Sequence, residues 1–81
     1  MKNTDVYQCM QMWQEKHKIY FGDKVRFIFD SCLYEGFLTG FDIESVPIKP
    51  IVRYVNHKGN SRIVALRSDA ILLKMNQSLV N

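Results

Sequence analysis

The second half of the chain gathers residues whose side chains neutralise phosphate or stack on a nucleobase. These residues are Arg53, Tyr54, His57, Lys58, Arg62 and Arg67. Cationic groups track a phosphate backbone, and an aromatic ring stacks on any base. Positions 41–81 hold six basic and three acidic residues, whereas positions 1–40 hold five of each, so the net charge of +3 arises in the second half. This asymmetry favours an acidic partner such as nucleic acid, and a solvated basic face is the equally weighted alternative.

Catalytic and metal-binding arrangements find little support in the spacing of the reactive residues. Cys32 and His57 could form a nucleophile–base pair, but Cys32 begins an expected strand, where a structural thiol is the better explanation. His17 and His57 lie far apart beside lysines, and no Cys-x-x-Cys spacing indicates a zinc site. The chain has no glycine-rich phosphate loop. We therefore expect a protein that is not an enzyme and that uses no metal or cofactor.

The composition is that of one small globular domain. The 81 residues are 47% hydrophobic and 23% charged, which argues against disorder and against a coiled coil. A disulfide scaffold of this length carries more than the two cysteines Cys9 and Cys32, so two buried thiols are favoured over one bridge. No apolar run approaches the ~20 residues of a membrane span, and residues 1–5 do not begin a signal peptide. We expect a single cytoplasmic domain over residues 1–81 with no membrane partner.

The first element that must position these residues is an amphipathic helix over residues 4–18. Its apolar side chains recur at steps of three and four, at Val6, Cys9, Met10 and Trp13. This spacing gathers them on one stripe, and Gly22 ends the pattern. We expect the stripe to close an open end of the domain, with Trp13 as the main anchor because an indole buries a large apolar area.

After the helix the hydrophobic period changes from 3.6 to 2, which predicts β-strands. Five short strands are expected at residues 25–29, 33–41, 51–55, 62–66 and 70–74. The prolines at 47 and 50 place the preceding stretch in a loop or at an edge, because proline cannot donate to a ladder. Strands without intervening helices predict a mainly β fold, a strongly bent antiparallel five-stranded barrel over residues 23–75 with an N-terminal α-helix. Residues 76–81 are expected to form a loose tail.

The hairpin between the third and fourth strands determines which basic residues share a face. A loop at residues 57–60 would place Asn56 opposite Ser61 and Arg53 opposite Val64. Arg53 and Arg62 would then lie on one face, near each other. Alternatively, both arginines cover the outside with their stems while Tyr54 belongs to the core. The expected core residues are Trp13, Val25, Phe27, Phe29, Leu38, Val52, Tyr54, Ile63, Ala65, Ile71 and Leu73.

Two stretches of the sequence resemble the motifs of the Sm-like family, whose members are small SH3-like β-barrels. The first covers residues 25–29 and 33–42, with an aromatic-acid-glycine segment at Tyr34-Glu35-Gly36 and an aromatic–aspartate pair at Phe41-Asp42. The second, at residues 65–71, is similar to the apolar-Arg-Gly step before the last strand of that family. The resemblance covers about residues 4–74. Other SH3-like barrels open with a step like Gly22-Asp23-Lys24-Val25.

The resemblance implies a ring of subunits that binds single-stranded RNA, with the fourth strand of one subunit paired to the fifth strand of the next. It also implies that Phe41, Asp42 and Arg67 contribute to the RNA site. This chain has Val46 at the family's asparagine position and Ser68 after Arg67 in place of glycine. Glu44 adds a negative charge in the same region.

These features predict a non-enzymatic module that binds single-stranded nucleic acid, RNA in preference to DNA, or a nucleoprotein. A homo-oligomer formed through edge strands is expected. The predicted nucleic-acid-binding residues are Phe41, Asp42, Arg53, Tyr54, Lys58, Arg62 and Arg67. The alternative, favoured by the departures from the Sm-like turns, is a protein-interaction module, such as an adaptor, an assembly factor or a small phage-type inhibitor, that does not bind nucleic acid.

Overall fold

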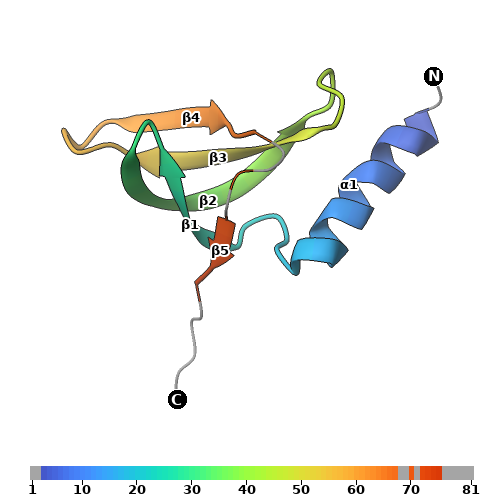
Figure 1. Ribbon diagram of the computed structural model, residues 1–81, viewed down its shortest axis with the longest axis horizontal. Coiled ribbons are helices and arrows are strands. Elements are labelled where there is room, and N and C mark those ends of the chain that lie inside the picture. Colours follow the sequence, from blue (N-terminus) through green and yellow to red (C-terminus); the bar gives the residue numbers. More distant parts are fainter. Residues whose placement is uncertain (1–2, 68–69, 71, 76–81) are drawn as a thin grey trace, which may run out of the picture.

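The computed structural model of the protein describes residues 3–67, 70 and 72–75 (Figure 1). One helix precedes five strands: α1 (Asn3–His17), β1 (Lys24–Phe29), β2 (Cys32–Asp42), β3 (Lys49–Val55), β4 (Ser61–Ala65) and β5 (Leu72–Lys74). The strands form one antiparallel sheet in the order β4-β3-β2-β1-β5. This confirms the mainly β class with an N-terminal helix. The sheet is bent but open, since β4 and β5 are its edges, and the expected tail at 76–81 lies outside the described residues.

Helix α1 ends at its own C-terminal signal rather than at Gly22. Lys18 has a left-handed backbone with a φ of 60°, and the Ile19 N–H donates to the Gln14 carbonyl oxygen at 3.1 Å. No helix in the described part of the chain is long and apolar enough to cross a membrane. Cys9 is exposed, because the helix packs on the core through Trp13 and Met10, and this corrects the expectation of two buried thiols. Cys9 and Cys32 are both free.

The turn between β1 and β2 has two residues in a strained conformation. Asp30 and Ser31 connect the paired residues Phe29 and Cys32, with φ angles of 53° and 64°. A two-residue turn with two positive φ angles matches the twist of a β-hairpin, and glycine is the preferred second residue. The turn nevertheless carries the steric cost of two Cβ atoms in the left-handed region.

A Ser31→Gly variant is expected to raise the free energy of unfolding by about 0.5–1 kcal/mol, because glycine adopts a positive φ without a Cβ clash. Urea denaturation measures this change. The control is Ser61→Gly in β4, where the same substitution should lower the free energy of unfolding by about 0.5–1 kcal/mol. A Ser31→Gly variant that is less stable than the parent would show that the turn is not strained.

Strands β2 and β3 pair across an irregularity that brings a proline into the sheet. The register shifts between Leu38 and Gly40, and beyond the shift Phe41 lies opposite Pro50. The Pro50 carbonyl accepts a hydrogen bond from the Leu66 N–H at 2.8 Å, so the side of Pro50 that lacks a donor faces the end of β4. Pro50 was expected in a loop or at an edge, and it lies instead in the interior strand β3. A proline is tolerated there because its nitrogen has no ladder partner.

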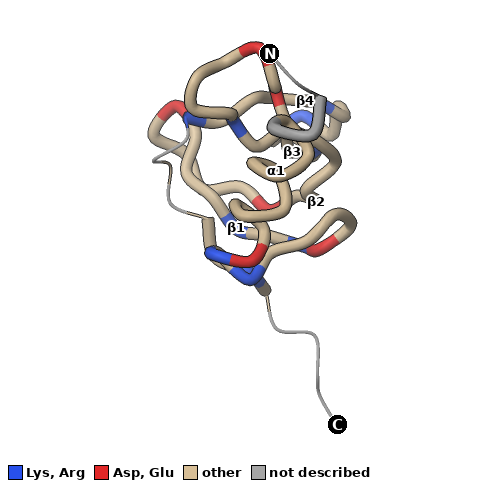
Figure 2. The backbone as a smooth tube through the Cα atoms, turned by 90° about the vertical axis from the view of Figure 1, so that its right-hand side faces the viewer, with Lys and Arg blue, Asp and Glu red and all other residues tan. Residues whose placement is uncertain are grey.

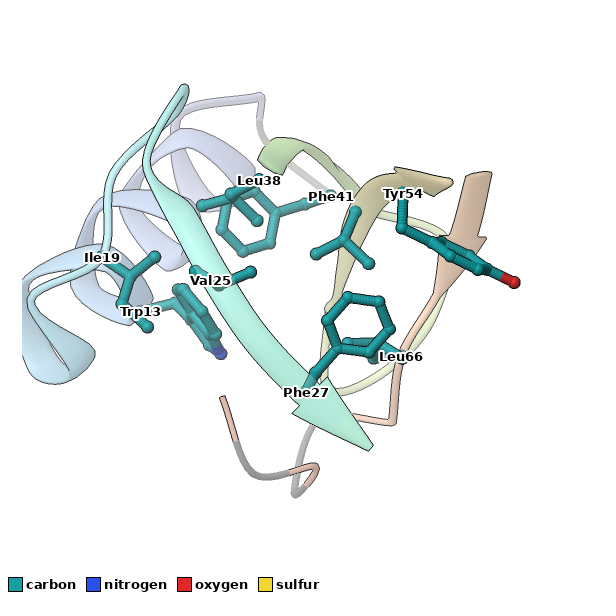
Figure 3. Close-up of a cluster of buried hydrophobic side chains, with 9 residues drawn as sticks. Trp13, Ile19, Val25, Phe27, Leu38, Phe41, Tyr54 and Leu66 are labelled. Atoms are coloured by element: carbon teal, nitrogen blue, oxygen red, sulfur yellow. The ribbon is translucent and has the colours of Figure 1, made fainter. Parts of the chain in front are cut away.

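The core lies on the concave face of the sheet and continues under α1 (Figure 3). Its buried members are Trp13, Ile19, Val25, Phe27, Leu38, Phe41, Val52, Tyr54 and Leu66. Six of the expected core residues are confirmed: Trp13, Val25, Phe27, Leu38, Val52 and Tyr54. Four are exposed and correct the prediction: Phe29, Ile63, Ala65 and Leu73. Strands β4 and β5 present the opposite face to the one expected, and Ile71 lies outside the described residues.

Candidate nucleic-acid interface

The structure divides the seven predicted site residues between the two ends of β3. Phe41, Asp42 and Arg67 lie near its first residues, because Phe41 and Asp42 pair with Pro50 and Lys49, and the Leu66 N–H donates to the Pro50 carbonyl. Phe41 also contacts Trp13 of α1. The other four lie along its last residues and the β3–β4 hairpin: Arg53, Tyr54, Lys58 and Arg62. Seven residues of β3 span about 20 Å at ~3.3 Å per residue. One short ligand contact therefore cannot include both groups.

The residues beside α1 already have structural partners. The Phe41 ring packs edge-on against Trp13 at 5.2 Å and Phe21 at 5.6 Å between centroids, and it is only 9% exposed. The Asp42 carboxylate accepts hydrogen bonds from the Glu44 N–H at 3.2 Å and the Ser45 hydroxyl at 3.1 Å. Burial argues against a base stacking on Phe41, and the contacts of Asp42 order the loop that follows β2. Arg67 is exposed.

The β3–β4 hairpin turns through three residues, one fewer than expected. Asn56 organises the turn: its side-chain oxygen accepts hydrogen bonds from the N–H groups of Lys58 and Asn60, each at 2.9 Å. The Gly59 N–H donates to the Asn56 carbonyl at 2.9 Å, and Gly59 has a φ of 87°, which only glycine adopts readily. This is a turn followed by a left-handed bulge residue, a common three-residue hairpin. Asn56 therefore pairs with Asn60, not with Ser61.

The shorter turn moves β4 by one residue against β3 and separates the two arginines. Arg62 lies opposite Tyr54, and Arg53 lies opposite Ile63. Because neighbouring residues of a strand point to opposite faces, Arg53 and Arg62 occupy different faces of the sheet. The expectation that they share a face is wrong. Arg62 joins the face that carries Tyr54, whereas Arg53 lies on the outer face between Phe37 and Ile63.

The β1–β2 and β3–β4 hairpins lie at the end of the sheet that is farthest from α1 (Figure 1). Aromatic rings from these hairpins contact one another. Tyr34 of β2 lies 4.6 Å from Tyr54 and 5.0 Å from His57 between ring centroids, and its plane is tilted by 32° from the imidazole. Phe29 extends the group to β1, 6.4 Å from Tyr54. Figure 3 shows the Tyr54 hydroxyl directed away from the core. Together with two adjacent cations, these rings form what we call the aromatic hairpin end: Phe29, Tyr34, Tyr54, His57, Lys58 and Arg62.

The cations of the β3–β4 hairpin lack the acidic partners that the cations of β1 and β5 have. Lys24 and Arg26 reach the Glu35 carboxylate at 3.8 and 3.0 Å, and Lys74 reaches that of Asp23 at 3.3 Å. Within the described ranges, none of the exposed cations of β3, β4 and the turn between them forms an ion pair: Arg53, Lys58 and Arg62. Toward the helix side, Figure 2 shows basic and acidic segments interspersed rather than in one basic track. Uncompensated positive charge therefore lies on the hairpin.

Tyr34 belongs to the aromatic hairpin end, but the sequence interpretation did not select it as a site residue. Tyr34 pairs with the buried Phe27. In the sequence it alternates with Gly36 and Leu38, and this period of two could have placed its ring on the core face of β2. Burial, followed by the neighbouring Cys32 thiol, raises the pKa of the Tyr34 hydroxyl above its usual value. The phenol therefore stays protonated at neutral pH and can donate a hydrogen bond.

Comparison with known proteins identifies no relative for this chain. No family model, curated protein or solved structure matches it. Among the described side chains, no three His, Cys, Asp or Glu residues gather in a way that could hold a metal ion. The functional inference therefore depends on the geometry of the aromatic hairpin end.

Proposed function

We propose that the protein is a non-enzymatic module that binds single-stranded nucleic acid at the aromatic hairpin end. The observation that supports this function is the exposed His57 ring against Tyr34, beside the unpaired cations Lys58 and Arg62. The preference for RNA over DNA follows from the resemblance of the sequence to the Sm-like family. The proposed site differs from the RNA turns of that family, since Phe41 and Asp42 have structural partners at the other end of β3.

The proposed contacts are one stack and two phosphate contacts. A base extends the stack on the exposed face of His57, which contributes about 1–3 kcal/mol in proteins that bind single strands. Lys58 and Arg62 flank the stack and neutralise two phosphates. Two such contacts predict that the logarithm of the binding constant falls with the logarithm of salt concentration with a slope of about −1.4.

A double Lys58→Glu, Arg62→Glu variant is expected to bind RNA about 10- to 100-fold more weakly, because two phosphate contacts become repulsions. Fluorescence anisotropy of labelled uridine homopolymer at low salt measures the change. The control is Lys2→Glu, Lys18→Glu, which changes the net charge equally but outside the hairpin. If both variants lose RNA affinity equally, the binding depends on net charge alone. If the hairpin variant keeps the parent's affinity, the proposed site is refuted.

A separate observation favours a second candidate function, the docking of a partner protein on the outer face of the sheet. On the outer face, Arg53 lies between Phe37 and Ile63, which are 44% and 68% exposed. Strand β4 beside them is an edge of the sheet, where unpaired backbone groups invite strand addition. Native mass measured with and without nuclease separates the two functions. A ring-sized mass with nuclease-sensitive material supports nucleic-acid binding, and a nucleic-acid-free monomer that ignores homopolymers supports protein docking.

A further inference from the structure

A groove separates α1 from the loop between β2 and β3. It has a volume of about 460 Å³ and continues into an adjoining hollow of about 140 Å³ that shares Cys9, Pro47 and Ile48 with it. We call this the helix groove and define it by Cys9, Met12, Trp13, Lys16, Pro47 and Ile48. A volume in this range accommodates a small organic molecule rather than a folded partner.

The walls of the helix groove are apolar and only partly covered. Met12 on the helix side is 61% exposed, and Val46 on the loop side of the adjoining hollow is 94% exposed. Trp13 is the buried residue of the helix groove, and its indole packs edge-on against the Phe41 ring. Exposed apolar surface that lines a concavity is favourable to cover, at ~25 cal/mol for each Å² removed from water. The hollow therefore offers binding energy to the apolar part of a ligand.

Positive charge lies at one end of the helix groove. Lys16 lies about two helical turns beyond Cys9 and lines the larger hollow together with His17. Among the described side chains, none that lines either hollow is acidic. The Trp13 carbonyl oxygen accepts a hydrogen bond from His17 Nδ1 at 2.9 Å, and the imidazole stacks on the Trp13 indole at 4.2 Å. The Nδ1–H group of His17 is therefore held by the helix, and Lys16 supplies the positive charge at this end of the helix groove. The charge pattern complements a ligand with an apolar body and one anionic end.

We propose that the helix groove binds a small amphipathic carboxylate, such as a medium-chain fatty acid. Its carboxylate pairs with Lys16, and its apolar chain lies along Met12 and Cys9 toward Pro47. The helix rises by about 15 Å over the ten residues from Val6 to Lys16, so the two hollows form an elongated site suited to a linear chain. This site lies at the opposite end of the sheet from the aromatic hairpin end and does not depend on nucleic-acid binding.

Trp13 is the sole tryptophan of the chain and lines the helix groove, so its fluorescence reports occupancy directly. Decanoate, titrated below its micelle-forming concentration, should produce a saturable change in emission. Decanol has the same chain without the charge, and it should bind about tenfold more weakly, the effect of one charge-assisted hydrogen bond. Absence of a saturable change, or equal binding of decanol, would overturn the proposal.

Variants on one face of the helix test the role of the cation. Lys16→Glu should weaken decanoate binding by at least about tenfold and leave decanol binding unchanged, while Lys16→Arg should retain both. The matched control is Lys18→Glu, since Lys18 is exposed and lies outside the helix groove. An equal loss of decanoate affinity in Lys16→Glu and Lys18→Glu would indicate a general charge effect and refute the site. The hairpin variants that weaken RNA binding should leave decanoate binding unchanged, so the two proposals fail separately.

Discussion

A Phe27→Ala variant is expected to lose about 3–5 kcal/mol of unfolding free energy, the usual cost of removing a fully buried phenylalanine ring. Phe27 is 1% exposed and contacts the rings of Tyr34 and Tyr54, with centroids 5.9 and 5.6 Å away. It is also paired on both sides, with Tyr34 in β2 and Leu72 in β5. An 81-residue domain has a total stability of about 4–12 kcal/mol, so the variant should retain little of it.

Phe29 provides the matched control for this prediction, because it is the same residue type on the same strand and face. It is 36% exposed at the open end of the sheet, so Phe29→Ala should cost less, about 1–2 kcal/mol. Urea denaturation followed by Trp13 emission measures both variants, since the indole lies in the same core. If the two substitutions cost the same, the core does not centre on Phe27. If Phe27→Ala unfolds at the parent's midpoint, the fold itself is wrong.

Where polar and apolar residues alternate, the sequence predicted both the position of the strand and which of its faces is buried. In β1, Val25 and Phe27 alternate with Arg26, and the structure buries the two apolar residues and exposes the arginine. A period of two then leaves one choice of buried face. Trp13 was predictable for a different reason: its size makes it costly to expose on a helix beside an open sheet.

The facing of β4 was not predictable, because Ile63-Val64-Ala65-Leu66 is continuously apolar and either pair could point inward. The choice depends on hairpin length. A three-residue turn held by Asn56 places Val64 and Leu66 toward the core, whereas a four-residue turn would have turned Ile63 inward. A one-residue difference in the loop reverses every side chain of the strand. Local hydrogen bonds of the Asn56 side chain within the turn therefore determine which face of β4 is buried.

The composition of the candidate sites likewise depends on the register of the strands and on how α1 packs against the sheet. Tyr54 and the cations Lys58 and Arg62 were evident as a basic and aromatic cluster, but their relation to Tyr34 and His57 depends on pairing between three strands. The burial of Phe41 depends on how α1 docks, which no local pattern specifies. A motif can therefore resemble a binding turn in sequence while its aromatic ring serves the core.

Gly36 is expected to be the position at which one added methyl group does the most damage. Gly36 is buried in the centre of the sheet, between Val25 of β1 and Tyr54 of β3. A Cβ there would collide with the carbonyl oxygen of Arg53 and would lie 3.0 Å from the Tyr54 Cβ. The obstacle is mainly backbone of a neighbouring strand, which cannot rotate away as a side chain can. Overpacking of this kind costs about 1–3 kcal/mol, and the rigid neighbour places Gly36→Ala near or above the upper value.

Gly40 lies in the same strand and provides a control with the opposite sign. A Cβ added there meets nothing within 4 Å, and its φ is not in the left-handed region. Gly40→Ala should therefore raise the unfolding free energy by about 0.4–1 kcal/mol, because alanine restricts the unfolded chain. The two variants, compared by urea denaturation, should differ by about 3–4 kcal/mol. Equal stability of the two would show that β2 and β3 do not approach closely at Gly36.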